Sequence, residues 1–424
     1  MIDKLNFKIA NEIYSKITDG THDSPKQKET GKPLITSKHI KGRTIDFTTA
    51  YLISEEDFNK INERSQVHKW DVIVSMIGEY CGYCYIERND IIDYAVKNVG
   101  LYKAGTKLEA EWLYYYLISP IGKAYLNSVK SGSSQPYLTL GGLRNLPILY
   151  PLQNNKKEKI AKVLSDLDAK IEVNNKINQE LEAMAKTLYD YWFVQFDFPD
   201  ANGKPYKSSG GKMVFNEVLK REIPEGWDIK KLDKLAEIKR GKLVTAKTAD
   251  LNGQYKVVSA GIDYSYKHSE YNREKYTITV SGSGANAGFI NFWRERIFAN
   301  DCTTVRGKTD EETFVILQFL KLRQEYILNQ ARGSAQPHVY PKDLESLKIL
   351  IPNIDLFKKY GKTILPFNEQ IAINEKENQK LSKLRDWLLP MLMNGQVTVG
   401  KTELELGMVA EDNTKYDNAK YGEK

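Results

Sequence analysis

Two long stretches of the chain carry mostly apolar residues at alternating spacings of four and three. In the first stretch these positions are Ile160, Leu164, Leu167, Ile171, Asn174, Asn178, Leu181, Ala185, Leu188 and Trp192. Adding 200 to each number gives the second series, which consists of Tyr360, Ile364, Phe367, Ile371, Asn374, Asn378, Leu381, Arg385, Leu388 and Leu392. A 4-3 spacing is a heptad seam, along which two helices can pack side by side. The pattern therefore predicts two long helices.

The two stretches differ in their proline content. No proline or glycine occurs from Lys156 to Trp192, so we expect one continuous helix of about 55 Å at 1.5 Å per residue there. The second stretch contains Pro366 and Pro390. Proline inside a helix removes a hydrogen bond and clashes with the preceding turn. We therefore expect the second helix to start late and to kink or stop early.

Both seams place two asparagines at their midpoints, Asn174 and Asn178 in the first and Asn374 and Asn378 in the second. A buried asparagine costs stability but fixes the register, because its amide needs a polar partner. The spacing favours an antiparallel helix pair in which these amides meet. The alternative is that they are solvated breaks in two separate amphipathic helices.

The segments outside the seams alternate short β-branched and aromatic runs with helical pieces, which is typical of an α+β fold. The predicted architecture is two tandem-related globular domains joined and separated by two antiparallel coiled-coil helices with pseudo-two-fold symmetry. The expected boundaries are a first domain at 1–152, a helix at 153–196, a linker at 197–210, a second domain at 211–352, a helix at 353–395 and a charged tail at 396–424.

Short motifs recur in both globular segments. Gly132-Ser-Ser-Gln-Pro136 returns as Gly333-Ser-Ala-Gln-Pro337, and Ser75-x-x-Gly78-x-x-x-Gly82 returns as Ser281-x-x-Gly284-x-x-x-Gly288. Ile17-x-x-Gly20 is matched more faintly by Ile238-x-x-Gly241. The repeating unit is a whole domain plus a long helix, so the chain is a tandem duplication and not a solenoid of short repeats.

Composition limits the class of protein. The chain has 424 residues, a net charge of +7 and three cysteines. Few cysteines and no apolar run of membrane-spanning length predict a cytoplasmic protein without a disulfide framework or a membrane contact. The net positive charge fits a polyanionic partner such as a nucleic acid.

Three motifs have structural explanations. Gly395-x-x-x-x-Gly400-Lys401-Thr402 has the letters of a phosphate-binding loop, but it follows a helix instead of a strand, so Gly395 is expected to end that helix. Cys81 and Cys84 lack the further ligands of a zinc site and are expected to be structural. The glycines near Gly282 are expected to form a tight connection between strands. We find no catalytic residues, no metal site and no cofactor motif.

The whole layout resembles the DNA specificity (S) subunits of type I restriction-modification systems. The resemblance rests on the repeated Gly-Ser-x-Gln-Pro, the Asn-x-x-x-Asn-Gln-x-Leu inside each helix, the Thr18-Asp-Gly-Thr-His22 loop and Pro224-Glu-Gly-Trp227. It implies a non-enzymatic subunit whose two target recognition domains each read part of a split double-stranded DNA sequence. It also implies two methyltransferase (M) subunits docked on the helices and restriction (R) subunits in the full complex.

Base and phosphate contacts are made by basic, amide and small polar side chains on loops. The candidates in this chain are polar or basic loop residues, and they comprise Thr21, His22, Lys38, His39, Lys41, Arg43, Tyr80, Lys239, Arg240 and Lys242. The alternative function is a coiled-coil scaffold that binds only proteins. The basic and tyrosine-rich globular segments favour DNA binding, since a scaffold would not need them.

Overall fold

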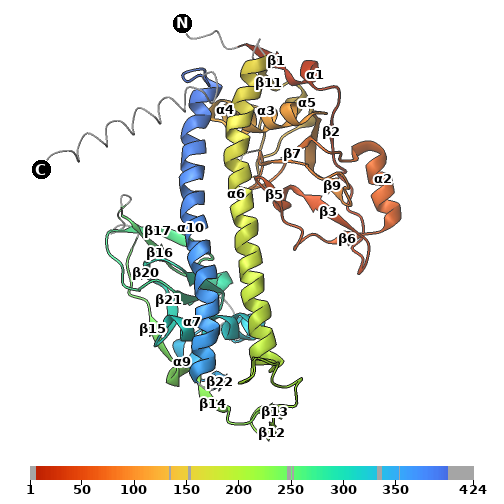
Figure 1. Cartoon of the computed structure of the whole chain (residues 1–424). Helices are drawn as coiled ribbons and strands as arrows, with labels where there is room; N and C mark the ends of the chain where they lie inside the picture. The colour runs from red at the N-terminus through yellow and green to blue at the C-terminus, as the bar shows by residue number, and fades with distance from the viewer. Residues whose placement is uncertain are drawn as a thin grey trace, which may run out of the picture. The chain divides into compact units, whose positions relative to one another are not determined.

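A computed structural model describes residues 6–132, 135–150, 154–245, 250, 253–331, 337–352 and 354–399 (Figure 1). The chain divides into two compact units. Unit 1 comprises Met1–Ile171 and Gln379–Lys424, and unit 2 comprises Glu172–Asn378. Each unit therefore holds one globular domain together with part of each long helix.

Domain 1, the globular part of unit 1, mixes short strands and helices. Its strands are β1 (Phe7–Ile9), β2 (Ile17–Asp19), β3 (Lys32–Thr36), β4 (Ile40–Lys41), β5 (Thr44–Ile45), β6 (Leu52–Ile53), β7 (Asp71–Ser75), β8 (Cys84–Ile86), β9 (Ala95–Lys97), β10 (Val99–Lys103) and β11 (Pro147–Leu149). Its helices are α1 (Ala10–Ile13), η1 (Ser37–His39), α2 (Glu55–Ser65), α3 (Lys107–Ile118), α4 (Pro120–Ser128) and α5 (Leu140–Arg144).

Unit 2 has the corresponding elements. Its strands are β12 (Met213–Asn216), β13 (Arg221–Pro224), β14 (Asp228–Lys231), β15 (Ala236–Arg240), β16 (Tyr255–Val258), β17 (Tyr264–His268), β18 (Thr277–Ser281), β19 (Ile290–Trp293), β20 (Ile297–Ala299), β21 (Cys302–Gly307) and β22 (Lys348–Ile351). Its shorter helices are η2 (Asp190–Val194), η3 (Leu232–Lys234), η5 (Gly284–Asn286), α7 (Asp310–Lys321), α8 (Gln324–Asn329) and α9 (Pro341–Glu345). We call the part from β14 to β22 domain 2.

The two domains share one sheet topology. An antiparallel sheet of order β2-β10-β7-β8 in domain 1 corresponds to β15-β21-β18-β19 in domain 2. A smaller sheet of order β6-β3-β9 corresponds to β17-β16-β20, and in both its central strand pairs with one parallel and one antiparallel neighbour. The α+β prediction and the domain duplication are therefore confirmed. Helix α2 stands between β6 and β7 only, since no helix separates β17 from β18.

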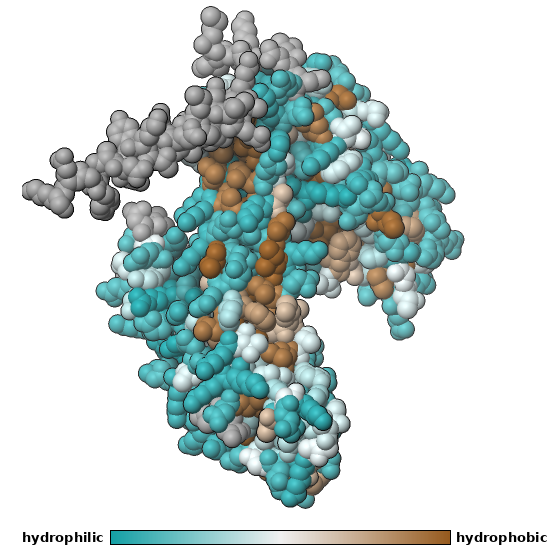
Figure 2. All heavy atoms as spheres, viewed as in Figure 1, coloured by the Kyte–Doolittle hydropathy of each residue, from teal (hydrophilic) through white to brown (hydrophobic). Residues whose placement is uncertain are grey.

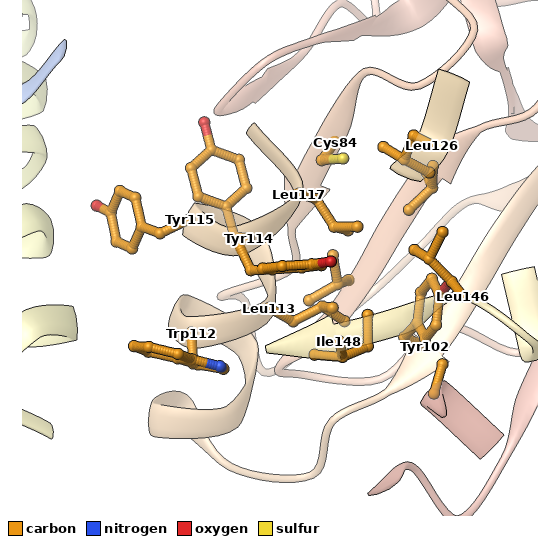
Figure 3. Packing of buried hydrophobic residues seen from close by; sticks show 14 of the residues in the cluster. Cys84, Tyr102, Trp112, Leu113, Tyr114, Tyr115, Leu117, Leu126, Leu146 and Ile148 are labelled. Carbon is orange, nitrogen blue, oxygen red and sulfur yellow. The ribbon is translucent and has the colours of Figure 1, made fainter. Parts of the chain in front are cut away.

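The core of domain 1 lies between α3 and the larger sheet. Figure 3 shows Trp112, Leu113 and Leu117 of α3 among side chains of the neighbouring strands and helices. Trp112 donates its indole N–H to the carbonyl of Leu149 at 2.7 Å, and Tyr102 donates its hydroxyl to the carbonyl of Leu143 at 2.8 Å. The buried polar ends of Trp112 and Tyr102 are thus satisfied.

The long helices are α6 (Asn154–Tyr189), followed by the π-helical turn η2, and α10 (Ile354–Met393). The prediction of a continuous first helix is confirmed. The prediction of a late start and an early stop for the second was wrong, because α10 runs through both prolines. Pro366 is exposed, so water can hydrate the carbonyl that it leaves unpaired, and Tyr360 and Ile364 keep this part of the helix buried on its other side. Pro390 stands three residues before the helix end.

The four seam asparagines meet as predicted, and all four lie in unit 2. Asn174 donates to Asn378 at 2.9 Å and to Glu377 at 2.7 Å, and Asn374 donates to Asn178 at 2.7 Å. The partner numbers run in opposite directions, so α6 and α10 are antiparallel there. Asn174 and Asn374 are buried, and the alternative of solvated breaks is excluded for both.

A shared charged residue in each unit ties the domain to the long helices, Asp168 in unit 1 and Arg294 in unit 2. In unit 1, Arg43 contacts Asp168 of α6 at 3.1 Å, and Arg385 of α10 contacts the same carboxylate at 2.6 Å. In unit 2, Arg294 contacts Glu182 of α6 at 2.7 Å and Glu375 of α10 at 3.1 Å. Arg294 can hold both helices because its planar fork presents several donors at fixed angles, and the carboxylate of Asp168 can accept from two arginines because it has two oxygens.

We predict opposite effects for one and for four replacements of the seam asparagines. Asn374→Leu alone should lower the free energy of unfolding by about 1 to 3 kcal/mol, because Asn178 loses its donor. Replacing all four asparagines by leucine should raise the melting temperature while it loosens the register. Thermal denaturation tests the first effect, and disulfide cross-linking between cysteines placed along α6 and α10 tests the second. A single, sharp cross-linking register in the fourfold variant would contradict the role given to the amides.

Candidate nucleic-acid interface

Four loops of domain 1 meet at one edge of the larger sheet. Thr21 pairs with Lys97 as an isolated β-bridge, and the N–H of Met76 donates to the carbonyl of Asn98 at 3.2 Å. Ile77 pairs in turn with Tyr137. These contacts join residues 20–24, 76–83, 96–98, 130–132 and 135–137, which we call the loop edge of domain 1.

Domain 2 builds its loop edge with the same hydrogen bonds. The N–H groups of Gly20 and Thr21 donate to the carbonyls of Val99 and Val96 at 2.8 and 3.1 Å. Those of Gly241 and Lys242 donate to Cys302 and Ala299 at 2.8 and 2.9 Å. The loop edge of domain 2 comprises residues 241–245, 282–289, 299–301 and 337–339. The faint sequence match around Gly20 and Gly241 therefore reflects a real structural equivalence.

Both glycines are required by close packing. A Cβ atom on Gly20 would lie 2.5 Å from the carbonyl oxygen of Val96, and one on Gly241 would lie 1.9 Å from that of Asn300. No side chain fits at such distances, because the obstructing atoms belong to the backbone. The glycines thus let the loop cross directly over the neighbouring strand.

The connections β7-β8 and β18-β19 are the tight turns that the sequence predicts. Gly78 and Gly82 have φ values of 77° and 93°, and Gly284 and Gly288 have 75° and 91°. The N–H of Gly78 donates to the carbonyl of Pro136 at 2.9 Å, and that of Gly284 donates to Pro337 at 3.0 Å. The proline that ends the repeated motif therefore fastens the glycine turn in both domains. Residues 133–134 and 333–336 of the repeated motif lie outside the described residues.

His22 is held in place although its side chain is 62% exposed. One ring nitrogen lies 3.0 Å from a carboxylate oxygen of Asp19, and the other lies 2.9 Å from the amide oxygen of Asn98. Thr21, its neighbour, is half-buried at the β-bridge. The edge therefore presents a fixed polar ring to the solvent.

Two further candidates form a cation–π pair. The ammonium of Lys41 lies 3.7 Å from the ring centre of Tyr80, which stands inside the glycine turn. Lys38 and Lys41 are exposed, and Tyr83 and Tyr137 add exposed aromatic rings to this edge. Sequence reasoning did not select Tyr83, Tyr137 or Asn98, because only the three-dimensional turn brings them beside the other candidates.

The structure gives His39 and Arg43 other roles than DNA contact. His39 is fully buried and accepts a hydrogen bond from the backbone N–H of Thr36 at 2.8 Å. Arg43 is turned toward Glu111, Tyr115 and Asp168, with its side chain only 12% exposed. Within the basic run 38–43, Lys38 and Lys41 are exposed while His39 and Arg43 turn inward, so the prediction is corrected for His39 and Arg43.

The basic residues of domain 2 remain on the surface. Lys239, Arg240 and Lys242 are exposed, and Arg240 lies 3.6 Å from Asp301. Asp301 also accepts a hydrogen bond from the hydroxyl of Ser283 at 2.7 Å. Domain 2 therefore has a carboxylate where domain 1 has the amide of Asn98, one residue before the equivalent strand.

The three cysteines are free and buried. Burial raises the pKa of the Cys84 and Cys302 thiols to about 12, so both stay protonated at neutral pH and are poor metal ligands. Among the described residues no group of three His, Cys, Asp or Glu side chains could hold a metal ion. Within the same residues no helix is long and apolar enough to cross a membrane.

The phosphate-loop motif at 395–402 is described only up to residue 399. Gly395 has φ 74° and follows the last turn of α10, where the N–H of Gln396 donates to the carbonyl of Met391 at 2.9 Å. It ends the helix as expected. Gly400, Lys401 and Thr402 lie outside the described residues.

Comparison with known proteins relates both units to one family. The family model described as type I restriction modification DNA specificity domain matches residues 18–183 and 224–383. The specificity subunit of the type I restriction enzyme MjaIX from Methanocaldococcus jannaschii is 28% identical over 310 residues, covering 68% of this chain and 69% of that protein. The HindI specificity subunit from Haemophilus influenzae is 23% identical over 407 residues, covering 79% and 88%.

A solved structure supports the fold. The crystal structure of the type I restriction-modification S subunit from M. genitalium superimposes with a TM-score of 0.53 at 18% identity, covering 94% of this chain and 98% of that one. Because the family model matches more than half of the chain, once for each globular domain, the chain belongs to the DNA specificity subunits of type I restriction-modification systems, which recognise DNA sequence.

Proposed function

We propose that each globular domain reads one half of a bipartite double-stranded DNA target through its loop edge. The observation that carries this proposal is that one backbone scaffold is built twice and presents different side chains each time. His22 and Asn98 stand at the edge of domain 1, and Leu243 and Asp301 take the equivalent places in domain 2. Different side chains on equal scaffolds suit two different half-sites.

The charge and shape of the loop edges fit a duplex. Lysines and arginines neutralise phosphates, while amide, imidazole and small polar groups read base edges. Lys38 and Lys41 flank the edge of domain 1, and Lys239, Arg240 and Lys242 flank that of domain 2. Tyr80 adds a ring whose face already attracts one cation.

The long helices form, in this proposal, an antiparallel coiled coil with a local two-fold axis between its midpoints. The pairs Asn174 with Asn378 and Asn178 with Asn374 support it, because each contact is the repeat equivalent of the other. A coiled coil of this kind would set the number of unread base pairs between the half-sites, as dimer geometry does in repressors.

The same helices carry apolar side chains that the fold leaves in water. Val173 and Met184 of α6 are 52% and 53% exposed, and their repeat equivalents Ile373 and Leu384 of α10 are 58% and 43% exposed. Figure 2 shows apolar residues gathered along the long helices on the face in view. We propose that these positions dock two methyltransferase subunits, one on each equivalent surface, and that restriction subunits join the full complex. The alternative function is that of a coiled-coil scaffold that binds only other proteins and does not read DNA.

The isolated chain should transfer no methyl group to DNA and cleave none. Sequence-specific adenine methylation should appear when methyltransferase subunits and S-adenosylmethionine are added, because the chemistry resides in those subunits. Incorporation of labelled methyl groups into DNA measures this. Methyl transfer by the purified chain on its own would reject the non-catalytic role.

Replacing Lys38 and Lys41 together by glutamine should weaken DNA binding and flatten its salt dependence. The slope of log affinity against log salt should fall by about 0.9 for each phosphate contact that is lost. The recognised sequence should stay the same. Lys220→Gln, on the turn between β12 and β13, removes one exposed charge as a control. Equal slopes for the double variant and the unaltered complex would show that this pair does not face DNA.

Inserting four residues after Asn175 tests the helices as a ruler. The insertion adds about 6 Å and about 40° beyond one full turn. Because base pairs rise about 3.4 Å, the gap between half-sites should grow by one or two base pairs while both half-sites stay unchanged. Some loss of stability is expected, since the seam is rotated. Methylome sequencing of cells that carry the variant measures the gap.

The matched control inserts the same four residues after Asn202, in the turn between the helix and β12. This insertion should leave the gap unchanged. If the helix insertion altered the half-site letters and kept the gap, the helix would not be the ruler.

A further inference from the structure

We propose that Leu243 reads one base of the half-site of domain 2 by contacting the methyl group of a thymine. The proposal rests on the function proposed above and adds a specificity-determining residue to it. Leu243 follows the basic residues at the end of β15, and its side chain is 83% exposed.

The backbone around Leu243 is fixed on both sides. The N–H groups of Gly241 and Lys242 donate to Cys302 and Ala299. On the other side, the N–H of Val244 donates to the amide oxygen of Asn300 at 3.0 Å, and the hydroxyl of Tyr266 donates to the carbonyl of Val244 at 2.8 Å.

The fixed backbone sets Leu243 apart from an ordinary surface residue. A single exposed leucine is common on proteins. Here, however, the side chain of the buried Asn300 holds the loop that carries Leu243. Its amide nitrogen lies 3.2 Å from the carbonyl oxygen of Val244 and 3.0 Å from the hydroxyl of Ser259. Because the loop is already ordered, a contact made by Leu243 costs little further conformational entropy.

The position of Leu243 corresponds to that of His22. Gly20 and Thr21 make the same backbone hydrogen bonds as Gly241 and Lys242, so the next residue in each domain is His22 or Leu243. Both His22 and Leu243 follow the point at which the loop crosses closely over the neighbouring backbone, which Gly20 and Gly241 permit. One domain thus presents a polar ring and the other a purely apolar side chain at the same point of the scaffold.

The surroundings of Leu243 indicate which partner it meets. Lys239, Arg240 and Lys242 are exposed close to it in the chain, and such a basic rim fits phosphates on either side of a groove. An apolar side chain that enters the major groove finds one apolar group on the base edges, the 5-methyl group of thymine. The geometry points to an A·T base pair in this half-site.

A substitution scan on both partners tests the contact. The recognised sequence is first taken from the methylome of cells that carry the chain. The complex with methyltransferase subunits is then titrated with duplexes in which deoxyuridine replaces thymidine at one position at a time. At one position of the half-site of domain 2, loss of the methyl group should weaken binding about fourfold, which corresponds to about 0.8 kcal/mol for one buried carbon.

Leu243→Ala should weaken binding to the thymine duplex by a similar factor and should be insensitive to deoxyuridine at that position. Ile91→Ala is the matched control, because Ile91 is 86% exposed in domain 1 and belongs to no loop edge. It should keep the full pattern of the scan. A Leu243→Ala complex that still loses fourfold affinity with deoxyuridine would overturn the proposal, and so would a half-site without an A·T pair.

The outcomes also separate this inference from the proposed function. Sequence-specific binding with no difference between Leu243→Ala and the unaltered complex rejects the leucine contact alone. Binding without any sequence preference rejects the proposed function as well.

Discussion

The register between α6 and α10 is the constraint on which the rest of the fold depends. Both domains bind to both helices, so each domain is correctly built only when the helices are correctly aligned. A shift of one turn would separate Arg385 from Asp168 in unit 1 and would pull Glu375 away from Arg294 in unit 2. The buried amides of Asn174 and Asn374 oppose such a shift, because a shifted helix would set them against apolar residues and leave them without partners.

Within each domain, the groups that stabilise the loop edge are different from the side chains that the edge presents to the solvent. The loop edge is held by backbone hydrogen bonds, by glycines and by one or two buried polar side chains. Asn98 has φ 54°, in the left-handed region that asparagine tolerates better than most residues. None of the contacts that hold the edge requires a particular residue at positions 22, 243 or 301. Side chains there are therefore free to differ between the domains without cost to the scaffold. The duplicated sheets with their diverged loops fit this separation, and so does the additional helix α2 in domain 1 alone.

Much of the architecture could be predicted because it depends on periodic patterns. The heptad spacing indicated both helices, and the paired asparagines indicated their antiparallel alignment. Pro366 misled the prediction, since its cost in an isolated helix was not weighed against the burial of Tyr360 and Ile364 on the other face. Tertiary packing outweighs a local preference in such cases.

The loop residues were harder to predict. His39 and Arg43 belong to a basic run, and only the fold shows that both turn inward. Leu243 was missed because the search favoured charged and polar types. The repeat alignment contained a signal for it, since Gly20 and Gly241 place Leu243 opposite His22. The sequence does not show whether a loop side chain turns inward or outward, because an irregular loop has no periodic pattern that assigns its residues to one face.

The core of domain 1 contains Leu389, Leu392 and Met393, which pack with Ala10, Tyr14 and Leu164. Residues from the two ends of the described chain thus complete one hydrophobic core. A ribosome adds about 5 to 20 residues per second, so domain 1 waits on the order of half a minute for its last apolar residues. During that time the surface that α10 will cover is open to water. Domain 2, in contrast, receives all of its residues within one continuous stretch from 172 to 378. Domain 2 follows domain 1 in the chain and is nevertheless the first of the two that can be complete.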